Sequence, residues 1–219
     1  MRNIITTALC LAISACGGGG GGSPSAQPAG DDAPAYVPRD VTPDMTVAIT
    51  VALYGDSLLN LEAAKLRLLL PNAQVLNHAI PGLRLQSLAV VDGEPATVDV
   101  IGFGTNDARA NPENPSAEQF QAELTAAVTR QQKAGHRVVI QTPPRTTNAI
   151  TRGWTYSDGV ARFAAAARAV AEQTGETLCD RFEDSQSWPD SAYLPDGMHY
   201  ADATQPAAIL AECIKAAIR

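Results

Sequence analysis

Residues 47–57 constrain the fold of this chain more than any other stretch. The first eight of them are almost all apolar and many are β-branched, which is typical of a strand buried on both faces of a sheet. The turn Gly55-Asp56-Ser57 follows, and residues 58–70 are mostly strong helix formers. Ser57 is therefore predicted at a strand-to-helix turn, at the end of the strand where ligand sites collect in α/β proteins. Taken alone, the pattern favours a plain N-cap role for Ser57.

Strand-like and helical segments alternate through the rest of the chain. Further strands are predicted at 73–77, 97–103, 136–141 and 176–179, and helices at 83–91, from 116 up to Gly135, at 157–174 and from about 204 onward. Ser116 and Gln119 form a capping-box pattern at the start of one of these helices. The alternation predicts an α/β fold in one domain, with a parallel sheet of about five strands and helices on both faces.

The first 45 residues are predicted to lie outside this domain. Arg2 and the short apolar run 4–15 are typical of an export signal and are too short to span a bilayer. Ile13-Ser14-Ala15-Cys16 resembles the bacterial lipobox, in which the cysteine is lipidated and becomes the first residue. The sequence thus predicts a signal peptide over 1–15, a lipidated Cys16 with a Gly- and Pro-rich tether over 16–45, and a globular domain over 46–219. The alternative is an ordinary signal with an incidental Cys16.

Export and charge limit the partners that we expect. Cys179 and Cys213 would lie in an oxidising compartment, where they form either a disulfide or two buried free thiols. Neither belongs to a Cys-x-x-Cys pair, and no histidine lies at ligand spacing from them, so no metal or other cofactor is expected. The formal net charge of −7 and the pI of about 4.9 argue against a nucleic-acid-binding face, which would be basic. We expect a monomer.

Four loops at the predicted carboxyl edge of the sheet carry polar residues or glycine in chain order. They contain Gly55-Asp56-Ser57-Leu58, residues 77–82, Gly104-Thr105-Asn106-Asp107, and Asp196-Gly197-Met198-His199. Together they resemble the four sequence blocks of the GDSL family of esterases and lipases, also called SGNH hydrolases, over about residues 47–219. The resemblance implies a flavodoxin-like, three-layer α/β/α fold and hydrolysis of carboxylic esters and thioesters without a metal.

Ester hydrolysis explains why these residue types are needed. A serine such as Ser57 is a weak nucleophile until a base takes its proton. His199 is the candidate base, since the ordinary pKa of histidine lies near 6.5. Asp196, three residues earlier, is placed to fix the tautomer of the ring. We therefore expect Ser57, His199 and Asp196 to form a catalytic triad.

The oxyanion that forms during attack needs hydrogen-bond donors placed in advance. The backbone N–H groups of Ser57 and Gly82 and the side-chain amide of Asn106 are expected to supply them, although Asn106 also fits a role as a cap of its own turn. His78 lies at the same predicted edge and is the rival base or a pocket residue. His136 is predicted at the opposite edge.

The chain departs from the family pattern at a few positions. Pro81 stands where members often have a small polar residue, and Leu59 and Asn60 follow where a later glycine is usual. These differences put the subfamily in doubt but leave the nucleophile in place. Asp56 and Asp107 are expected to brace local backbone.

The sequence leaves the substrate open. The leading interpretation is a serine esterase anchored in the bacterial cell envelope, with the outer membrane favoured, that hydrolyses acetyl esters of envelope polysaccharide or acyl esters of lipids. The alternatives are an acyl thioesterase or lysophospholipase, and an idle binding lipoprotein. Arg145 is a candidate to bind an anionic group of the substrate. Four aromatic residues in two predicted loops either line an open site or pack against the domain: Trp154, Tyr156, Trp188 and Tyr193.

Overall fold

The sheet of this protein has five parallel strands. The computed structural model describes residues 49–88, 95–109, 114–147 and 157–219, which all fall in one compact unit, Asp40–Arg219. The strand order is β2-β1-β3-β4-β5, as predicted by the likeness to flavodoxin-like folds. The strands are β1 Ile49–Gly55, β2 Ala73–Asn77, β3 Val98–Gly102, β4 Arg137–Gln141 and β5 Thr177–Cys179.

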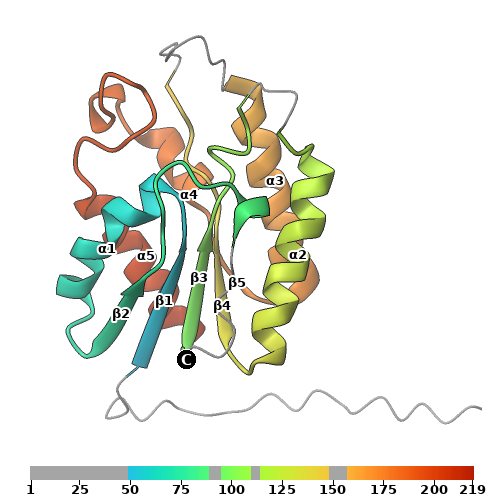
Figure 1. Ribbon diagram of the computed structural model, residues 1–219. Coiled ribbons are helices and arrows are strands. Elements are labelled where there is room, and N and C mark those ends of the chain that lie inside the picture. Colours follow the sequence, from blue (N-terminus) through green and yellow to red (C-terminus); the bar gives the residue numbers. More distant parts are fainter. Residues whose placement is uncertain (1–48, 89–94, 110–113, 148–156) are drawn as a thin grey trace, which may run out of the picture. The chain divides into compact units, whose positions relative to one another are not determined.

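Helices cover both faces of the sheet, so the fold has the expected three layers (Figure 1). One face is covered by α1 Ser57–Leu69 and α5 Thr204–Ala217, and the other by α2 Ala117–Lys133 and α3 Ser157–Thr174. The capping box at the start of α2 is present as predicted, since Ser116 and Gln119 exchange hydrogen bonds between side chain and backbone.

Alternation along the strands divides the core into two layers. In β1, Val51 and Leu53 pack with residues of α1 and α5, whereas Ala52 and Tyr54 pack with residues of α2 and α3. Successive side chains of a strand point to opposite faces, so an apolar run supplies both layers at once. This explains why the strands at the centre of the sheet lack a polar face.

A disulfide joins the last strand to the last helix. Cys179 at the end of β5 is bonded to Cys213 of α5, with 5.7 Å between their Cα atoms. Of the two arrangements left open by the sequence, the structure therefore has the disulfide. The 34-residue separation encloses the whole segment that carries Asp196 and His199.

Two segments differ from the prediction. Only a 3₁₀ turn, η1 Leu85–Ser87, stands within the helix expected at 83–91, and part of that range lies outside the described residues. Between the strand predicted at 176–179 and the helix predicted from about 204, where no element was expected, the structure contains α4 Arg181–Asp184 and the 3₁₀ turns η2 Ser185–Ser187 and η3 Asp190–Ala192. The carboxylate of Asp180 accepts the Glu183 N–H at 3.3 Å, so a side-chain cap starts α4.

Candidate active site

The turn after β1 holds Ser57 without using its hydroxyl as a cap. Asp56 is the N-cap of α1, because its Oδ1 accepts the Leu58 N–H at 2.9 Å. Gly55 is required here, since a Cβ at this position would lie 2.6 Å from the carbonyl oxygen of Gly102 in the neighbouring strand. Ser57 is the first residue of α1, and its Oγ lies 2.8 Å from Nε2 of His199. The plain N-cap interpretation of Ser57 is therefore wrong.

The ring of His199 is held between a serine and a carboxylate. Its Nδ1 lies 2.6 Å from Oδ2 of Asp196, while Oδ1 of that carboxylate accepts the N–H groups of Met198 and His199 at 2.9 Å each. Partial burial acts to raise the pKa of Asp196, but the hydrogen bonds from His199 and from the backbone outweigh it and lower the pKa. The Nδ1 atom of His199 thus faces the Asp196 carboxylate, and its Nε2 atom faces the Ser57 hydroxyl.

A tight hairpin presents Asp196 and His199. Tyr193 and Tyr200 form an antiparallel bridge at its base, the Leu194 N–H donates to the carbonyl of His199 at 2.8 Å, and Gly197 takes a positive φ of 68° at the tip. These local bonds fix the spacing between the carboxylate and the imidazole. Asp196 and His199 are therefore set as a unit before any substrate arrives.

Aromatic packing joins this hairpin to the serine turn. Leu58, next to Ser57, shares a buried cluster with Trp188, Tyr193 and Tyr200. Trp188 and Tyr193 are only 6% and 5% exposed, so they pack in the core of the loop region instead of lining a site. The other two aromatic residues named above, at positions 154 and 156, lie outside the described residues.

Arg145 also holds structure. Its Nε donates to the carbonyl of Ser185 at 2.7 Å, and its guanidinium also bonds the carbonyl of Trp188 and lies 3.1 Å from the carboxylate of Asp190. The guanidinium stacks over the Tyr193 ring. With these partners Arg145 ties the β4 loop to the segment before the hairpin, so the prediction that it meets an anionic substrate gains no support.

Gly82 lies in a β-turn that follows β2. The Leu83 N–H donates to the carbonyl of Ile80 at 3.1 Å, and the Ile80 N–H donates to that of Gly55 at 3.0 Å. With Pro81 in the second position and Gly82 in the third at φ 81°, the turn has the residue pattern of type II. This accounts for Pro81, the departure from the family pattern. Among the described residues the Gly82 N–H has no hydrogen-bond partner.

Asn106 reaches the same edge, but its amide is already engaged. Its Nδ2 donates to Oδ2 of Asp56 and to the carbonyl of Leu83, both at 3.2 Å. Asn106 is 2% exposed. Both hydrogens of the amide thus have protein acceptors, and a role as oxyanion donor requires that one of them be shared. That role stays a prediction.

Two buried carboxyl groups support the loops behind the serine. Burial raises the pKa of Asp56 to about 7, with further upward contributions from Asp107 and Glu62, against the Leu58 N–H and Arg109. Burial likewise raises the pKa of Asp107 to about 6, and its oxygens accept backbone N–H groups of two neighbouring loop segments. Asp107 thus braces backbone, as the sequence suggested.

An ion pair that was not predicted from the sequence lies beneath the site. Glu62 of α1 lies 3.3 Å from Arg181 of α4, and both side chains are fully buried. Gln141 at the end of β4 donates to the two Glu62 oxygens at 3.1 and 3.2 Å. One sequence signal could have predicted this pair. Glu62 shares the inward face of α1 with Ala63 and Leu66, and a carboxylate on an apolar face needs a partner.

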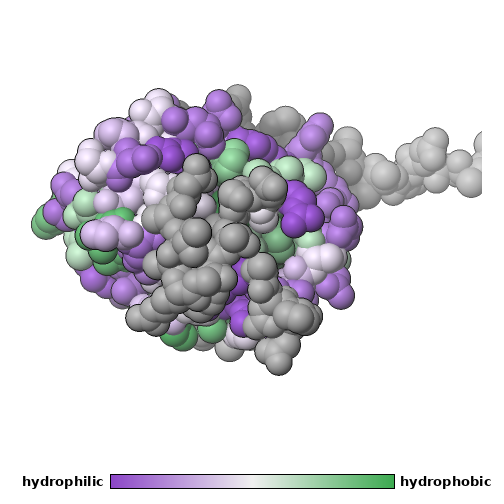
Figure 2. All heavy atoms as spheres, turned by 90° about the horizontal axis from the view of Figure 1, so that it is seen from above, coloured by the Kyte–Doolittle hydropathy of each residue, from purple (hydrophilic) through white to green (hydrophobic). Residues whose placement is uncertain are grey.

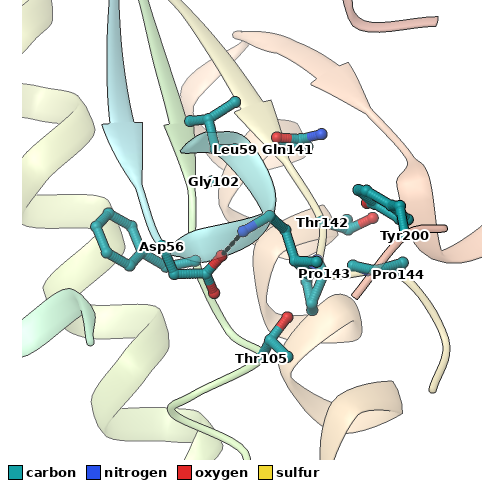
Figure 3. A pocket seen from close by; sticks show the side chains of 11 residues that line it. Asp56, Leu59, Gly102, Thr105, Gln141, Thr142, Pro143, Pro144 and Tyr200 are labelled. Atoms are coloured by element: carbon teal, nitrogen blue, oxygen red, sulfur yellow. Dashed lines mark hydrogen bonds between the residues drawn. The ribbon is translucent and has the colours of Figure 1, made fainter. Parts of the chain in front are cut away.

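Beside Asp56 lies a small pocket, with room for about one water molecule. Figure 3 shows the Asp56 carboxylate turned toward the Leu58 N–H, with Thr105 and Pro143 approaching from the ends of the neighbouring strands. The described residues that are visible from above in Figure 2 are mainly hydrophilic, with hydrophobic side chains in separate patches.

The other two histidines contact other residues. His78 stacks on the ring of Tyr54 with 5.2 Å between centroids. His136 lies before β4 at the opposite edge, where its Nδ1 is 2.8 Å from buried Asp99. Within the ranges that the structure describes, no three His, Cys, Asp or Glu side chains gather as metal ligands, and no helix is long and apolar enough to cross a membrane.

The fold is shared with solved hydrolase structures. The lipase/acylhydrolase of Enterococcus faecalis superimposes with a TM-score of 0.66 at 19% identity, covering 77% of this chain and 96% of its own. The acetyl xylan esterase AlAXEase gives 0.65 at 16% identity, covering 78% and 100%. A catalytic mutant of Axe2, an acetylxylan esterase of Geobacillus stearothermophilus, gives 0.63 at 14%, covering 78% and 95%.

The sequence itself carries the family assignment. No curated protein matches this chain, but residues 45–205 match the model of the GDSL-like lipase/acylhydrolase family. That range covers most of the chain and includes the serine turn and the hairpin with His199. The chain therefore belongs to the GDSL-like lipase/acylhydrolase family and is an ester hydrolase of the SGNH type.

Proposed function

We propose that this protein is a serine esterase in which Ser57 is the nucleophile, His199 the general base and Asp196 the residue that orients the base. The observation that carries the proposal is the continuous pair of contacts from Ser57 Oγ to His199 Nε2 and from His199 Nδ1 to Asp196. A serine, an imidazole and a carboxylate within hydrogen-bond reach of one another are the parts that nucleophilic acyl transfer needs.

The reaction runs in two halves. Ser57 Oγ attacks the ester carbonyl carbon while His199 Nε2 takes the hydroxyl proton, and the tetrahedral oxyanion is bound by the N–H groups of Ser57 and Gly82 and by the Asn106 amide. The C–O bond to the alcohol breaks as His199 returns the proton to the leaving oxygen. Water then attacks the acyl-serine with His199 again as base, which releases the carboxylic acid and restores Ser57.

We propose short acyl groups, with acetyl esters of carbohydrates as the substrate class. Support comes from two of the superimposed structures, which are acetyl xylan esterases. The test is hydrolysis of p-nitrophenyl esters of increasing acyl length and of acetylated glycans. We expect Ser57→Ala to abolish turnover and the exposed control Ser187→Ala to keep it. Faster turnover of long acyl esters or thioesters would favour the lipase or thioesterase alternative.

We further propose that the chain is anchored in the bacterial cell envelope through a lipid on Cys16. Support comes from the sequence alone, because Ile13-Ser14-Ala15-Cys16 and the glycine run after it lie outside the described residues. Mass spectrometry of the native protein is expected to show diacylglyceryl-modified Cys16 as the first residue. An unmodified Cys16 would contradict the anchor and leave the esterase proposal intact.

A further inference from the structure

Helix α1 exposes an apolar face that the fold does not use. The described residues expose five large hydrophobic side chains, and three of them belong to α1: Leu61 at 41%, Leu68 at 77% and Leu69 at 39%. Together with Lys65 they follow the spacing i, i+4, i+7, i+8, which places them on one side of a helix. We call these four residues the outer face of α1.

The opposite side of α1 already supplies its share of the core. Leu59, Ala63 and Leu66 are at most 2% exposed and pack with β1 and α5. A surface helix is normally polar on its outer side, and clustered exposed apolar side chains mark interaction surfaces. The outer face of α1 therefore indicates a partner with an apolar component.

The charges on α1 indicate that this partner is anionic. The basic residues of the helix are Lys65, whose side chain is 44% exposed, and Arg67, which is exposed and donates to the carbonyl of Val75 at 3.3 Å. The one carboxylate of the helix, Glu62, is buried against Arg181. Lys65 lies 3.9 Å from Asp202, but both side chains are exposed and such pairs contribute little. Lys65, Arg67 and Asp202 together leave one net positive charge beside the exposed leucines, in a chain of formal net charge −7. A second copy packed symmetrically on this surface would bring like charges together.

The position of α1 suits a membrane as the partner. Ile49 at the start of β1 pairs with Ala73, and the Ala73 N–H donates to the carbonyl of Leu70. Leu68 and Leu69 thus lie at the edge of the domain where the segment from Cys16 enters. A Gly-rich chain of about 30 residues reaches on the order of 30 Å, so an anchor at Cys16 would keep this edge close to the bilayer and raise its effective concentration there.

We propose that the outer face of α1 is a membrane-contact surface that seats the domain on a bilayer containing anionic phospholipid. Leucines enter the headgroup boundary while Lys65 and Arg67 meet lipid phosphates. Ser57 lies at the other end of the same helix, so the catalytic edge then opens along the bilayer surface. The inference uses the proposed anchor for its reach and does not depend on the proposed catalysis.

The test is a fluorescent reporter in the full chain. Leu68→Trp is prepared beside the matched control Leu194→Trp, whose parent residue is 45% exposed but lies on the hairpin with His199. Each protein is added to vesicles of phosphatidylethanolamine and phosphatidylglycerol that contain brominated acyl chains, and the signal of the parent protein is subtracted. We expect a blue shift and about twofold quenching at position 68, and little change at position 194.

Further variants separate this surface from catalysis. Adding Lys65→Glu and Arg67→Glu to the Leu68→Trp chain, or replacing phosphatidylglycerol by phosphatidylcholine, is expected to remove the quenching. Hydrolysis of soluble p-nitrophenyl acetate is expected to stay at the parent rate in all Leu68 variants. Three results would overturn the inference: no quenching at position 68, equal quenching at both positions, or a blue shift without vesicles that grows with protein concentration and so indicates a second copy.

Discussion

Ser57 and His199 lie 142 positions apart in the chain, yet the serine Oγ and the imidazole Nε2 are separated by 2.8 Å. The contact depends on the packing of their neighbours, because Leu58 and Tyr200 belong to the same buried cluster. The serine turn and the hairpin are thus held in register by apolar packing one residue away from the chemistry. This arrangement leads to predictions for catalysis and for stability.

Asp196→Asn tests the orientation of the base. An asparagine can keep the two backbone hydrogen bonds of Oδ1, but its amide nitrogen would face Nδ1 and force the ring proton onto Nε2. The ring could then no longer accept the Ser57 proton, so we expect kcat to fall by about 10⁴ with a small change in KM. Asp190→Asn, an exposed carboxylate that pairs with Arg145, is the control. A near-parental kcat in Asp196→Asn would contradict the triad.

The pH profile identifies the base. Only neutral imidazole accepts a proton, so kcat/KM is expected to rise with pH on the acid side of the profile, which we call the acid limb. Asp196 does not cause this limb, because its lowered pKa keeps it ionised throughout. His199→Gln should remove the limb with nearly all activity, and His78→Gln should keep it. If the limb survives in His199→Gln and disappears in His78→Gln, the base is His78.

Asp56 is expected to make stability fall with rising pH. Its pKa is raised to about 7 by burial, so from about pH 4 to 7 the folded protein holds a proton that the unfolded chain releases. This stabilisation is present at low pH and is lost as the pH rises through 7. The free energy of unfolding, measured with urea, should fall between pH 5 and pH 8. This fall should be roughly 2–3 kcal/mol larger in the parent than in Asp56→Asn.

The control for Asp56 is Asp202→Asn. Hydrogen bonds from Thr204 lower the pKa of this exposed carboxylate. Replacing Asp202 should therefore leave the fall in the free energy of unfolding between pH 5 and pH 8 unchanged. If the parent and Asp56→Asn have parallel stability curves, Asp56 is ionised in the folded protein. The combined effect of Asp107, Glu62 and Arg109 on the pKa of Asp56 would then be smaller than the one described above.

The disulfide is expected to stabilise the segment that carries Asp196 and His199. Closing a loop with a separation of 34 residues stabilises by about 4 kcal/mol in the chain-entropy model, or roughly 10 °C in Tm for a domain of this size. Calorimetry of the oxidised parent, the reduced parent and Cys179→Ala with Cys213→Ala measures the difference. Equal Tm values for the oxidised and reduced parent would show that the bond contributes no stability.

The features predicted well from the sequence are those with a local cause. The helix expected at 157–174 has those bounds in α3, because its apolar periodicity and the following Gly175 are both local signals. The capping box at Ser116 is equally local. The parallel sheet follows from the alternation of elements, since the connections between parallel strands leave few topologies.

The features that were missed depend on contacts distant in sequence. Arg145 was considered for substrate because a single cation in a loop shows no partner, and its acceptors lie about 40 positions away. The pair of Glu62 and Arg181 joins residues 119 positions apart. The engagement of the Asn106 amide by Asp56 could not be predicted either, because side-chain hydrogen bonds follow from the packing of two loops.

The most direct test of the account is covalent labelling of the nucleophile. A fluorophosphonate is incubated with the protein, and the modified peptide is located by mass spectrometry while esterase activity is followed. We predict one phosphonate per chain, on Ser57, with activity lost in proportion to labelling and no adduct in His199→Gln under the same conditions. An adduct on another serine, or activity that persists when Ser57 is fully labelled, would contradict the central claim.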